Sequence, residues 1–484
     1  MKNQLQAFLT KKQKLFLFIF FIGTLTNISA QKVVGGYLPT YSINNLTNAQ
    51  LRDKMAHLTH LYFFSVTSSY NGQIGTAKTV NGSATFTYIQ NDPDFFTKLD
   101  RVKNVKAWNG LDTKVILVVG GELSSYYLHS MIKNTTNEAT YAANLVQFCH
   151  ANGFDGIDVD WEDYTTSSGT QLKYTGAEYT NLLQKIKSEI TAQASSNGGK
   201  VLSLSATLVP ERYDRTGISG IFQYIDYLQI MSYGGGSRIG NDTQVPISKL
   251  DQYYTGWITN LSLPANKYVI GLPVYAKTLN TEFTQKVLST SYKNLIDSNP
   301  TIVNSKPDRA VVSSFTSGGM PYSNVPFYFN CVNTIKTKGQ YVLDNNLKGV
   351  MFWEITQDFD YTNSNSLIRA MNEKISVYGG SSSKTTGGKG TLSTDEIIKD
   401  TQNHFTVFPN PSSEVFNVSF YSNNPESTKI MVYDINSRLV WENTKPLLLG
   451  DNNLEVNFKT LNKGFYVLKI IDGNQTLTRK LVKN

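Results

Sequence analysis

A row of carboxylic acids on a short alternating segment is the clearest sign of chemistry in this chain. Residues 154–162 read FDGIDVDWE, in which Asp158, Asp160 and Glu162 alternate with apolar residues. A period of two predicts a β-strand with two different faces, one of which carries only carboxylates. Acids on one face repel one another, so their pKa values must separate. A carboxyl group that keeps its proton near neutral pH can act as a general acid, and Glu162, at the open end of the strand, is the candidate.

Two other interpretations fit an acidic run of this kind. A calcium loop also supplies oxygens at alternate positions, but such loops use an internal glycine and polar spacers, where this segment has Val159 and Trp161. A solvated edge strand would also tolerate acids. Residues 148–153 are typical of a helix end with a glycine cap, and a strand that directly follows a helix favours a buried α/β sheet. We therefore interpret the run as a buried strand.

Seven further segments predict strands that must position this one. Together with the acidic run, the predicted strands cover residues 32–37, 58–65, 114–119, 154–162, 201–206, 227–233, 268–275 and 349–354. Helical periodicity fills several gaps, such as 179–190 and 330–338. Eight βα units over about 340 residues are the number found in a (β/α)8 TIM barrel, an α/β fold. A doubly wound sheet has the same succession of elements and stays open as the alternative.

The acidic run resembles the D-G-x-D-x-D-x-E signature of glycoside hydrolase family 18, the chitinase-type enzymes, and residues 155–162 fill every fixed position. This family is an exception among retaining glycosidases, because the substrate's own acetamide oxygen replaces a carboxylate nucleophile. The resemblance implies that Glu162 is the general acid and then the base. It also implies that Asp160 accepts the acetamide N–H, and that Asp158 shares a proton with Asp160.

The same resemblance assigns roles at the ends of other predicted strands, where the chemistry of a TIM barrel gathers. Tyr233, at the end of the sixth strand, would donate a hydrogen bond to the acetamide oxygen. Trp353, at the end of the eighth, would stack under the reacting sugar. Further residues expected to line the sugar site are Tyr37, Phe63 or Phe64, Met231 and Tyr275. Each of these, taken singly, is equally consistent with packing inside the barrel.

Some positions depart from the family pattern. The third strand reads VVGGE from Val118 to Glu122 where the family has Ser-x-Gly-Gly-Trp, so a supporting hydroxyl and a stacking tryptophan are both missing. Gly234 stands where many chitinases have aspartate, and Lys277 stands where arginine is usual. None of these positions is the predicted acid. We therefore expect the departures to affect the choice of substrate more than the reaction.

Composition limits the possible partners. The chain has 484 residues, 40% of them hydrophobic, which suits two or three domains, and its formal net charge is +8. The first 30 residues hold four lysines and no acid, so the rest carries about +4 and is not expected to bind nucleic acid. Cys149 and Cys331 are distant in sequence, which favours buried free thiols. The five histidines show no metal-ligand spacing, and we expect neither a metal nor a cofactor.

Both ends of the chain differ from the predicted barrel. Residues 1–30 combine lysines, a short apolar run and small residues, which predicts a secretory signal peptide rather than a membrane anchor. The barrel would span 31–378, with a small α+β insertion at 276–347, where the gap between the seventh and eighth strands is too long for one helix. Gly- and Ser-rich 379–403 predicts a flexible linker. Short strands over 404–484 predict a small all-β sandwich domain.

This C-terminal domain resembles the sorting domain of the type IX secretion system of Bacteroidetes. The resemblance rests on Phe408-Pro409-Asn410-Pro411, on Tyr433-Asp434, on Gly464-Phe465-Tyr466 and on a short basic end. It implies contact with the secretion machinery and export across the outer membrane, to the cell surface or the medium. A carbohydrate-binding module is the alternative.

These observations predict a secreted, monomeric hydrolase of β-1,4 bonds next to N-acetylglucosamine, acting on chitin or chitooligosaccharides. An endo-β-N-acetylglucosaminidase acting on N-glycans uses the same acidic run, and the departures at Val118, Glu122 and Gly234 keep it open. A lectin-like binder is the alternative from another functional class. Such binders usually lack the final Glu or the central Asp of the run, whereas both Glu162 and Asp160 are present here.

Overall fold

The computed structural model describes residues 31–80, 83–234, 238–240, 243–279, 282–283, 286–299, 308–375, 405–408, 410, 412–422, 425–426, 428–434, 438–443, 446–447, 450–472 and 475–484. The predicted signal peptide and linker lie outside the described residues. No helix within the described ranges has the length and apolar character needed to cross a membrane.

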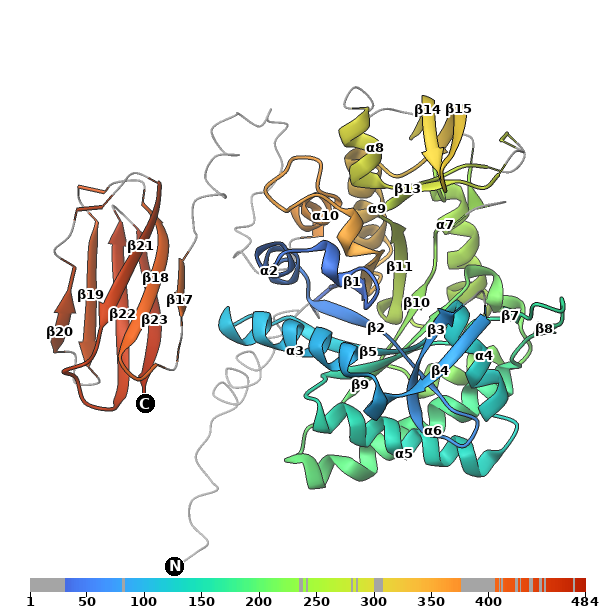
Figure 1. The fold of residues 1–484 in the computed structure, drawn as a ribbon, viewed down its shortest axis with the longest axis horizontal. Helices are drawn as coiled ribbons and strands as arrows, with labels where there is room; N and C mark the ends of the chain where they lie inside the picture. Colours follow the sequence, from blue (N-terminus) through green and yellow to red (C-terminus); the bar gives the residue numbers. More distant parts are fainter. Residues whose placement is uncertain are drawn as a thin grey trace, which may run out of the picture.

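Eight parallel strands form a closed barrel (Figure 1). They are β1 (Val33–Pro39), β2 (His60–Ser68), β5 (Lys114–Gly120), β6 (Gly156–Asp160), β9 (Ser203–Leu208), β10 (Tyr227–Ile230), β11 (Tyr268–Pro273) and β16 (Gly349–Trp353). Their order around the barrel follows the chain, and the pairing of β1 with β2 and with β16 closes it. Each predicted strand corresponds to one of these. The closure confirms the TIM barrel and excludes the doubly wound sheet, which would leave two edges unpaired.

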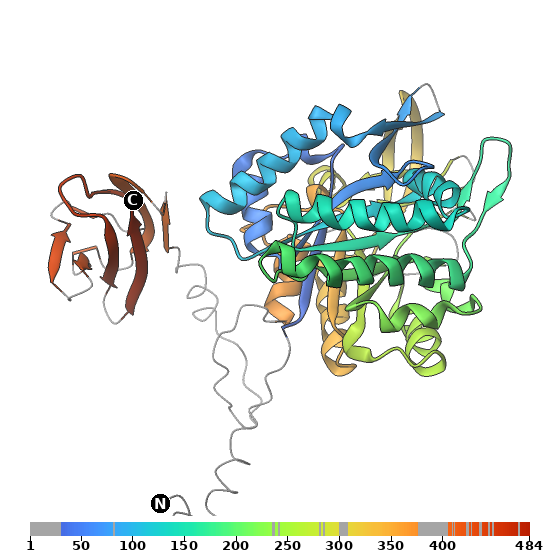
Figure 2. The same ribbon diagram turned by 90° about the horizontal axis from the view of Figure 1, so that it is seen from below.

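Helices cover the outside of the barrel. They are α2 (Asn48–Ala56), α3 (Pro93–Trp108), α4 (Glu122–Met131), α5 (Thr135–Ala151), α6 (Gly176–Ala194), α7 (Ile247–Tyr254), α9 (Val332–Asp344) and α10 (Leu367–Ile375). Capping boxes at Thr47 and Thr175 start α2 and α6. Figure 2 shows α5 and α6 side by side on the outer surface. Cys149 in α5 and Cys331 at the start of α9 are buried free thiols, as predicted.

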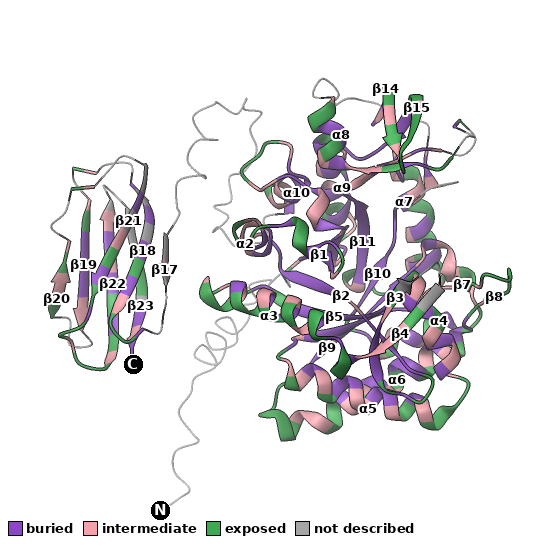
Figure 3. Ribbon diagram, in the orientation of Figure 1, coloured by how far each residue is buried: buried purple, intermediate pink, exposed green. Residues whose placement is uncertain are grey.

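The alternation of side chains along the strands divides the buried residues into two layers. Side chains such as Ile157 and Val159 point outward and pack in the large core between strands and helices. A smaller cluster fills the barrel interior and includes Tyr37, Tyr62 and Met231. Figure 3 shows the barrel strands as almost entirely buried, with exposed residues on the outer helices. Residues on the inner face therefore converge on one axis from all eight strands.

Several short strands are added to this barrel. A hairpin of β3 (Ile74–Val80) and β4 (Ser83–Tyr88) extends β2, and β7 (Tyr164–Thr165) pairs with β8 (Gln171–Leu172) after the acidic run. Between β11 and α9 lies an antiparallel sheet in the order β13 (Ser289–Ser291), β12 (Tyr275–Lys277), β15 (Met320–Tyr328) and β14 (Arg309–Ser317). It carries one helix, α8 (Tyr292–Ser298), which gives the α+β insertion that the long gap predicts.

The C-terminal region is an all-β domain with two sheets. One contains β17 (Phe405–Phe408), β18 (Val415–Ser422) and β21 (Gly450–Asn457). The other contains β20 (Leu439–Glu442), β19 (Lys429–Asp434), β22 (Gly464–Asp472) and β23 (Gln475–Lys483). Apolar residues of both sheets, such as Phe416 and Leu468, share one core. This arrangement is the predicted sandwich.

Candidate active site

Strand β6 directs two of the three acids into the barrel. Asp158 and Asp160 are buried on its inner face, whereas Ile157 and Val159 belong to the outer core. Glu162 follows the last strand residue by two positions and lies at the carboxyl end of the barrel, partly exposed. The row therefore runs from the barrel interior, at Asp158, to the open face, at Glu162. The burial of Asp158 and Asp160 in a central strand excludes the solvated edge strand.

Asp158 is fixed by donors from three other strands. Its Oδ2 accepts from the Tyr37 hydroxyl at 2.7 Å and from Thr207 Oγ1 at 2.9 Å. Its Oδ1 accepts from Ser205 Oγ at 2.6 Å and from Gln229 Nε2 at 3.0 Å. These bonds favour the carboxylate form, but complete burial outweighs them and raises the pKa of Asp158. The predicted residue Tyr37 thus reaches the site through Asp158.

Asp160 is buried without a matching set of donors. It is 3% exposed, and its Oδ1 has no hydrogen-bond partner among the described residues. Burial, and then the negative charges of Glu162 and Asp158, raise the pKa of Asp160 well above its ordinary value. The protonated form of Asp160 is therefore more favoured than that of an ordinary aspartic acid. A buried oxygen without a partner is a position where a ligand can supply the missing hydrogen bond.

Glu162 has the pKa of a general acid that works near neutral pH. Burial and the neighbouring carboxylate of Glu122 raise the pKa of Glu162 to about 7. The positive charge of Arg238 and a hydrogen bond from the backbone amide of Glu122 act in the opposite direction. An acid with this pKa is protonated in about half of the molecules at neutral pH, and it can return as a base after losing its proton.

Aromatic side chains from five strands, or from the residues that directly follow them, pack together inside the barrel near the acids. The Trp353 ring lies 5.4 Å from the ring of Tyr37 and 5.1 Å from that of Phe64. The Tyr233 ring lies 6.4 Å from the ring of Tyr275, edge to face. The pKa of Tyr233 is raised well above its usual value by burial first and then by the charge of Asp160, so its hydroxyl stays a donor. Met231 packs in the same interior cluster.

Phe63 is not part of this group, although the strand-end position suggested it. Its ring is fully buried in the outer core, 5.3 Å from the ring of Phe95 and 6.4 Å from that of Phe154. The next residue, Phe64, points to the opposite face of β2 and meets Trp353 instead. The reason is the two-residue period of a strand, by which neighbouring side chains lie on opposite faces.

Other residues of the site were not expected from the sequence. Ser205, Thr207 and Gln229 are polar residues on inward positions of β9 and β10, and their spacing in otherwise apolar strands was a usable signal. Arg238 lies in the segment after β10, where it donates to the Tyr233 carbonyl at 3.1 Å and pairs with Glu211 at 2.7 Å. No pattern in the sequence marks Arg238, because its position depends on contacts with residues that the local sequence does not indicate, such as Glu211.

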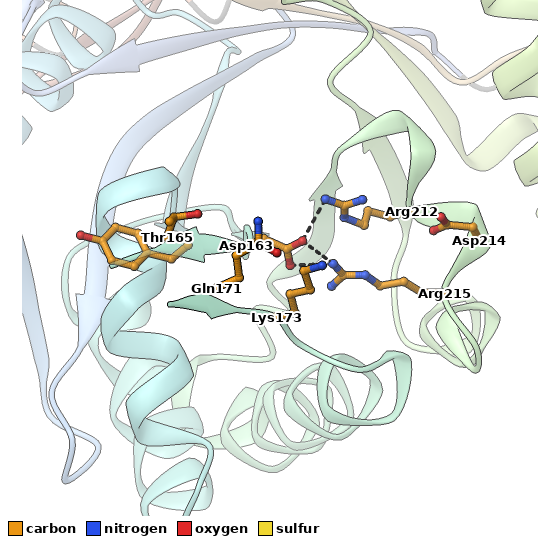
Figure 4. A pocket seen from close by; sticks show the side chains of 8 residues that line it. Asp163, Thr165, Gln171, Lys173, Arg212, Asp214 and Arg215 are labelled. Atoms are coloured by element: carbon orange, nitrogen blue, oxygen red, sulfur yellow. Dashed lines mark hydrogen bonds and ion pairs between the residues drawn. The ribbon is translucent and has the colours of Figure 1, made fainter. Parts of the chain in front are cut away.

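A polar pocket of about 410 Å³ is lined in part by Asp163, the residue that follows Glu162 in the chain (Figure 4). Its residues are Asp163, Tyr164, Thr165, Gln171, Lys173, Arg212, Asp214 and Arg215. Asp163, next to Glu162 in the chain, accepts hydrogen bonds from Arg212 at 2.9 Å and from Arg215 at 2.6 Å. These ion pairs join the segment after β6 to the segment after β9.

The family model of the glycosyl hydrolases family 18 matches residues 33–358, and that of the secretion system C-terminal sorting domain matches residues 406–484. Chitinase 1 from Aphanocladium album is 28% identical over 268 residues, which are 50% of this chain and 61% of that protein. Chitinase A1 from Niallia circulans is 24% identical over 333 residues, which are 61% of this chain and 46% of that protein. The chain thus spans less than two thirds of the length of these relatives.

Solved structures agree in fold. Chitinase ChiA74 from Bacillus thuringiensis has a TM-score of 0.54 at 18% identity, with 94% of this chain and 85% of that chain covered. A chitinase-like agglutinin from Robinia pseudoacacia has a TM-score of 0.51 at 18% identity, with 71% of this chain and 99% of that chain covered. At this identity the likeness shows the fold alone, and the same fold carries enzymes and an agglutinin. Because the family model covers most of the chain, including every barrel strand and all three acids, the chain belongs to the glycosyl hydrolases family 18.

Proposed function

We propose that this protein hydrolyses the β-1,4 bond next to N-acetylglucosamine in chitin and chitooligosaccharides, with retention of configuration. The observation that carries the proposal is the arrangement of two acids at the end of β6. Glu162, just beyond the strand, has a pKa of about 7, and behind it lies Asp160, whose buried Oδ1 has no hydrogen-bond partner among the described residues. The names of the relatives, which are chitinases, support the choice of substrate.

The first step needs an acid and a nucleophile. Glu162 gives its proton to the glycosidic oxygen, so that the leaving sugar departs neutral. Asp160 would be a poor nucleophile, because burial and two neighbouring acids raise its pKa and so favour its protonated form. The substrate's acetamide oxygen is then the group left to attack the anomeric carbon, which gives a cyclic oxazolinium ion. The acetamide N–H would donate to Asp160 Oδ1 and supply the partner that this atom lacks.

The oxazolinium ion changes the proton balance of the inner acids. Its positive charge lowers the cost of ionising Asp160, whose proton can pass inward to Asp158. The donors on Asp158 come from strands on different sides of the barrel, so this acid stays in place whichever carboxyl holds the proton. In the second step water attacks the anomeric carbon and gives its proton to the Glu162 carboxylate. The enzyme returns to its starting state, and configuration is retained.

The surrounding aromatic residues would orient the sugar. Tyr233 keeps its proton and would donate to the acetamide oxygen, which aims this oxygen at the anomeric carbon. Trp353, packed against Tyr37 and Phe64, offers a rigid apolar surface for the C–H face of a sugar ring. Met231 and Tyr275 line the same interior and would complete the wall.

Two departures from the family pattern favour a second substrate class, the N-glycans cleaved by an endo-β-N-acetylglucosaminidase. Glu122 is exposed at the start of α4, beside Glu162, where a stacking tryptophan is usual. Val118 is buried opposite Asp158 in the register of β5 and β6, where a supporting serine is usual. The loss of a stacking surface on the leaving-group side would weaken binding of a long chitin chain more than the reaction itself.

The C-terminal domain supports a role outside the cytoplasm. Residues 406–484 match the model of a secretion system sorting domain. We infer that this domain directs export through that machinery and that the barrel, a monomer, works at the cell surface or in the medium. A chain that ends after α10 should then stay inside the producing cell, while the full chain reaches the outside. Equal amounts of the two chains in the medium would contradict this role.

Two substrates tested in parallel would decide the reaction. A chitin oligosaccharide should yield short N-acetylglucosamine oligomers, first released as the β-anomer, while a glycoprotein with high-mannose and complex glycans should yield no free glycan. Glu162→Gln should lower kcat by at least about 10² to 10⁴-fold, because the lost group serves both steps. Release of intact glycan alone would move the function to deglycosylation. A folded Glu162→Gln variant with an unchanged rate would exclude Glu162 as the acid.

A further inference from the structure

The backbone that carries the acid lies beyond the barrel sheet. The last register pair of β6 with β5 is Gly120 with Asp160, and the last with β9 is Val159 with Ala206. Glu162 comes after both, so no barrel strand holds its N–H and C=O groups. Backbone groups in a largely buried place need partners, and the direction of the Glu162 side chain depends on which partners these are.

Helix α4 and its N-cap residue supply hydrogen-bond partners for the backbone of Asp160 and of Glu162, from residues about one helical turn apart. The Gly121 N–H donates to the Asp160 carbonyl at 2.7 Å. The Glu162 N–H donates to Ser125 Oγ at 2.8 Å. His129 Nε2 lies 2.9 Å from the Glu162 carbonyl oxygen. A spacing of four places these residues on one face of the helix, and both backbone groups of Glu162 are held by that face.

The histidine in this set acts as a donor. A carbonyl oxygen only accepts, so the hydrogen of the His129 ring is on Nε2. Burial lowers the pKa of His129 and so favours the neutral ring, although the hydrogen bond to the Glu162 backbone and then the negative charges of Asp163 and Glu178 oppose the change. The ring also packs against Trp161 at 5.2 Å, which fixes its plane.

We propose that Ser125 and His129 are positioning residues for the general acid, which hold the main chain of Glu162 so that its carboxyl group faces the reacting bond. The proposal rests on the proposed function, in which Glu162 is that acid. Neither residue needs to touch substrate. Ser125 and His129 are 0% and 5% exposed, and their bonds to Glu162 end on backbone atoms. The structure thus uses a helix, rather than a strand neighbour, to set the angle of the group that moves the proton.

A merely structural contact between α4 and the barrel would use the same hydrogen bonds, so the test must separate the two roles. His129→Ala removes the donor, while His129→Gln places an amide N–H close to the position of Nε2. Ser130→Ala is the matched control, because Ser130 lies on the same helix and its hydroxyl donates to the Tyr126 carbonyl at 3.2 Å, away from Glu162.

We expect His129→Ala to lower kcat by roughly ten- to a hundred-fold with little change in KM, because a small misplacement of a catalytic group has a cost of this order. His129→Gln should recover most of the loss, and Ser130→Ala should match the unchanged protein. The proposal is overturned if His129→Ala keeps full kcat, or if His129→Gln is as impaired as His129→Ala. In the second case the ring would act by packing alone.

A readout that does not need activity separates this proposal from the proposed function. Carbon-13 labelling of glutamate carboxyl groups, with Glu162→Gln to assign the signal, gives the pKa of Glu162 by NMR titration. Its charged neighbours Glu122, Asp160, Asp163 and Arg238 are unchanged in the His129 variants. We expect a lower pKa in His129→Ala, as water reaches a carboxyl group that burial had protected, and recovery in His129→Gln. Equal pKa values in all three proteins would overturn the positioning role, even if no substrate were cleaved.

Discussion

Glu162 has a raised pKa because of burial and of nearby charges, and Glu122 is the nearby charge whose effect is easiest to remove. Its carboxylate is the second cause, after burial, of the raised pKa of Glu162. A group that must be protonated to react loses activity as the pH rises through its pKa. Glu122 therefore extends activity towards higher pH. It stands at a position where the family usually has a stacking aromatic residue, so one substitution changes both the charge and the surface of the site.

Glu122→Gln should move the alkaline limb of the pH profile of kcat/KM to lower pH, because it removes a negative charge that favours the protonated acid. The shift should stay below about one pH unit, since Glu122 is exposed and solvent screens its charge. The same shift should shrink at high salt. Asp100→Asn, an exposed acid on α3, is the control. An alkaline limb that stays in place, or moves to higher pH, would contradict the assignment.

At the level of elements, the junction between β5 and α4 contacts both the acidic run and the aromatic residues of the site. Gly121 has a φ of +87°, and a Cβ there would lie 2.2 Å from a ring atom of Phe64. The same glycine donates to the Asp160 carbonyl. The backbone at Gly121 therefore contacts the Phe64 ring on one side and Asp160 on the other. The ring is so close that only glycine fits at this position.

Gly121→Ala should lower both activity and stability, because the added methyl group pushes Phe64 away from Trp353. Gly110→Ala is a suitable control. Gly110 also has a positive φ, of +59°, but a Cβ there would meet nothing within 4 Å. Backbone strain should cost Gly110→Ala about 1–2 kcal/mol of unfolding free energy and Gly121→Ala about 1–3 kcal/mol, to which the contact with Phe64 adds. Only Gly121→Ala should also lose kcat. Equal activity of the two variants would show that the packing of Phe64 has no part in the reaction.

Elements could be predicted from the sequence better than individual contacts. The eight strands were visible because each combines apolar runs with turn residues, and the acidic run was visible because its period is two. Phe63 and Phe64 could not be told apart, because β2 is buried on both faces and its sequence does not alternate. Arg238 could not be predicted for a different reason. Its contact with the Tyr233 carbonyl is a tertiary contact that no local sequence pattern indicates.

For the molecule as a whole, one buried lysine, Lys338, makes the free energy of unfolding depend on pH. Lys338 of α9 is 1% exposed, and its ammonium group donates to the Gln244 carbonyl at 3.0 Å and to Asn330 Oδ1 at 2.8 Å. Burial lowers the pKa of Lys338 to about 7 from its ordinary value of 10.5. Between these two values the unfolded chain holds a proton that the folded chain lacks, so this residue makes stability rise with pH over that range.

Lys338→Met should remove this dependence. The difference in unfolding free energy between the original protein and the variant should then grow in favour of the original protein between about pH 7 and pH 9, by an amount on the order of 1–3 kcal/mol. Denaturant unfolding at the two pH values measures it. Lys374→Met on α10, a lysine with a partly exposed side chain, serves as the control. A constant difference across this range would mean that Lys338 is charged in the folded protein.

The hydrogen bonds of Asp158 connect four strands, β1, β6, β9 and β10, across the barrel interior. Glu162 lies outside that network, at the rim. We therefore expect Asp158 and Glu162 to differ in how easily they can be replaced in related proteins that bind sugar without carrying out the proposed hydrolysis. Such proteins could replace Glu162 without disturbing the barrel, whereas replacing Asp158 would leave buried donors from three strands unpaired. Asp158 would then be retained for the stability of the barrel even where the proposed reaction had been lost.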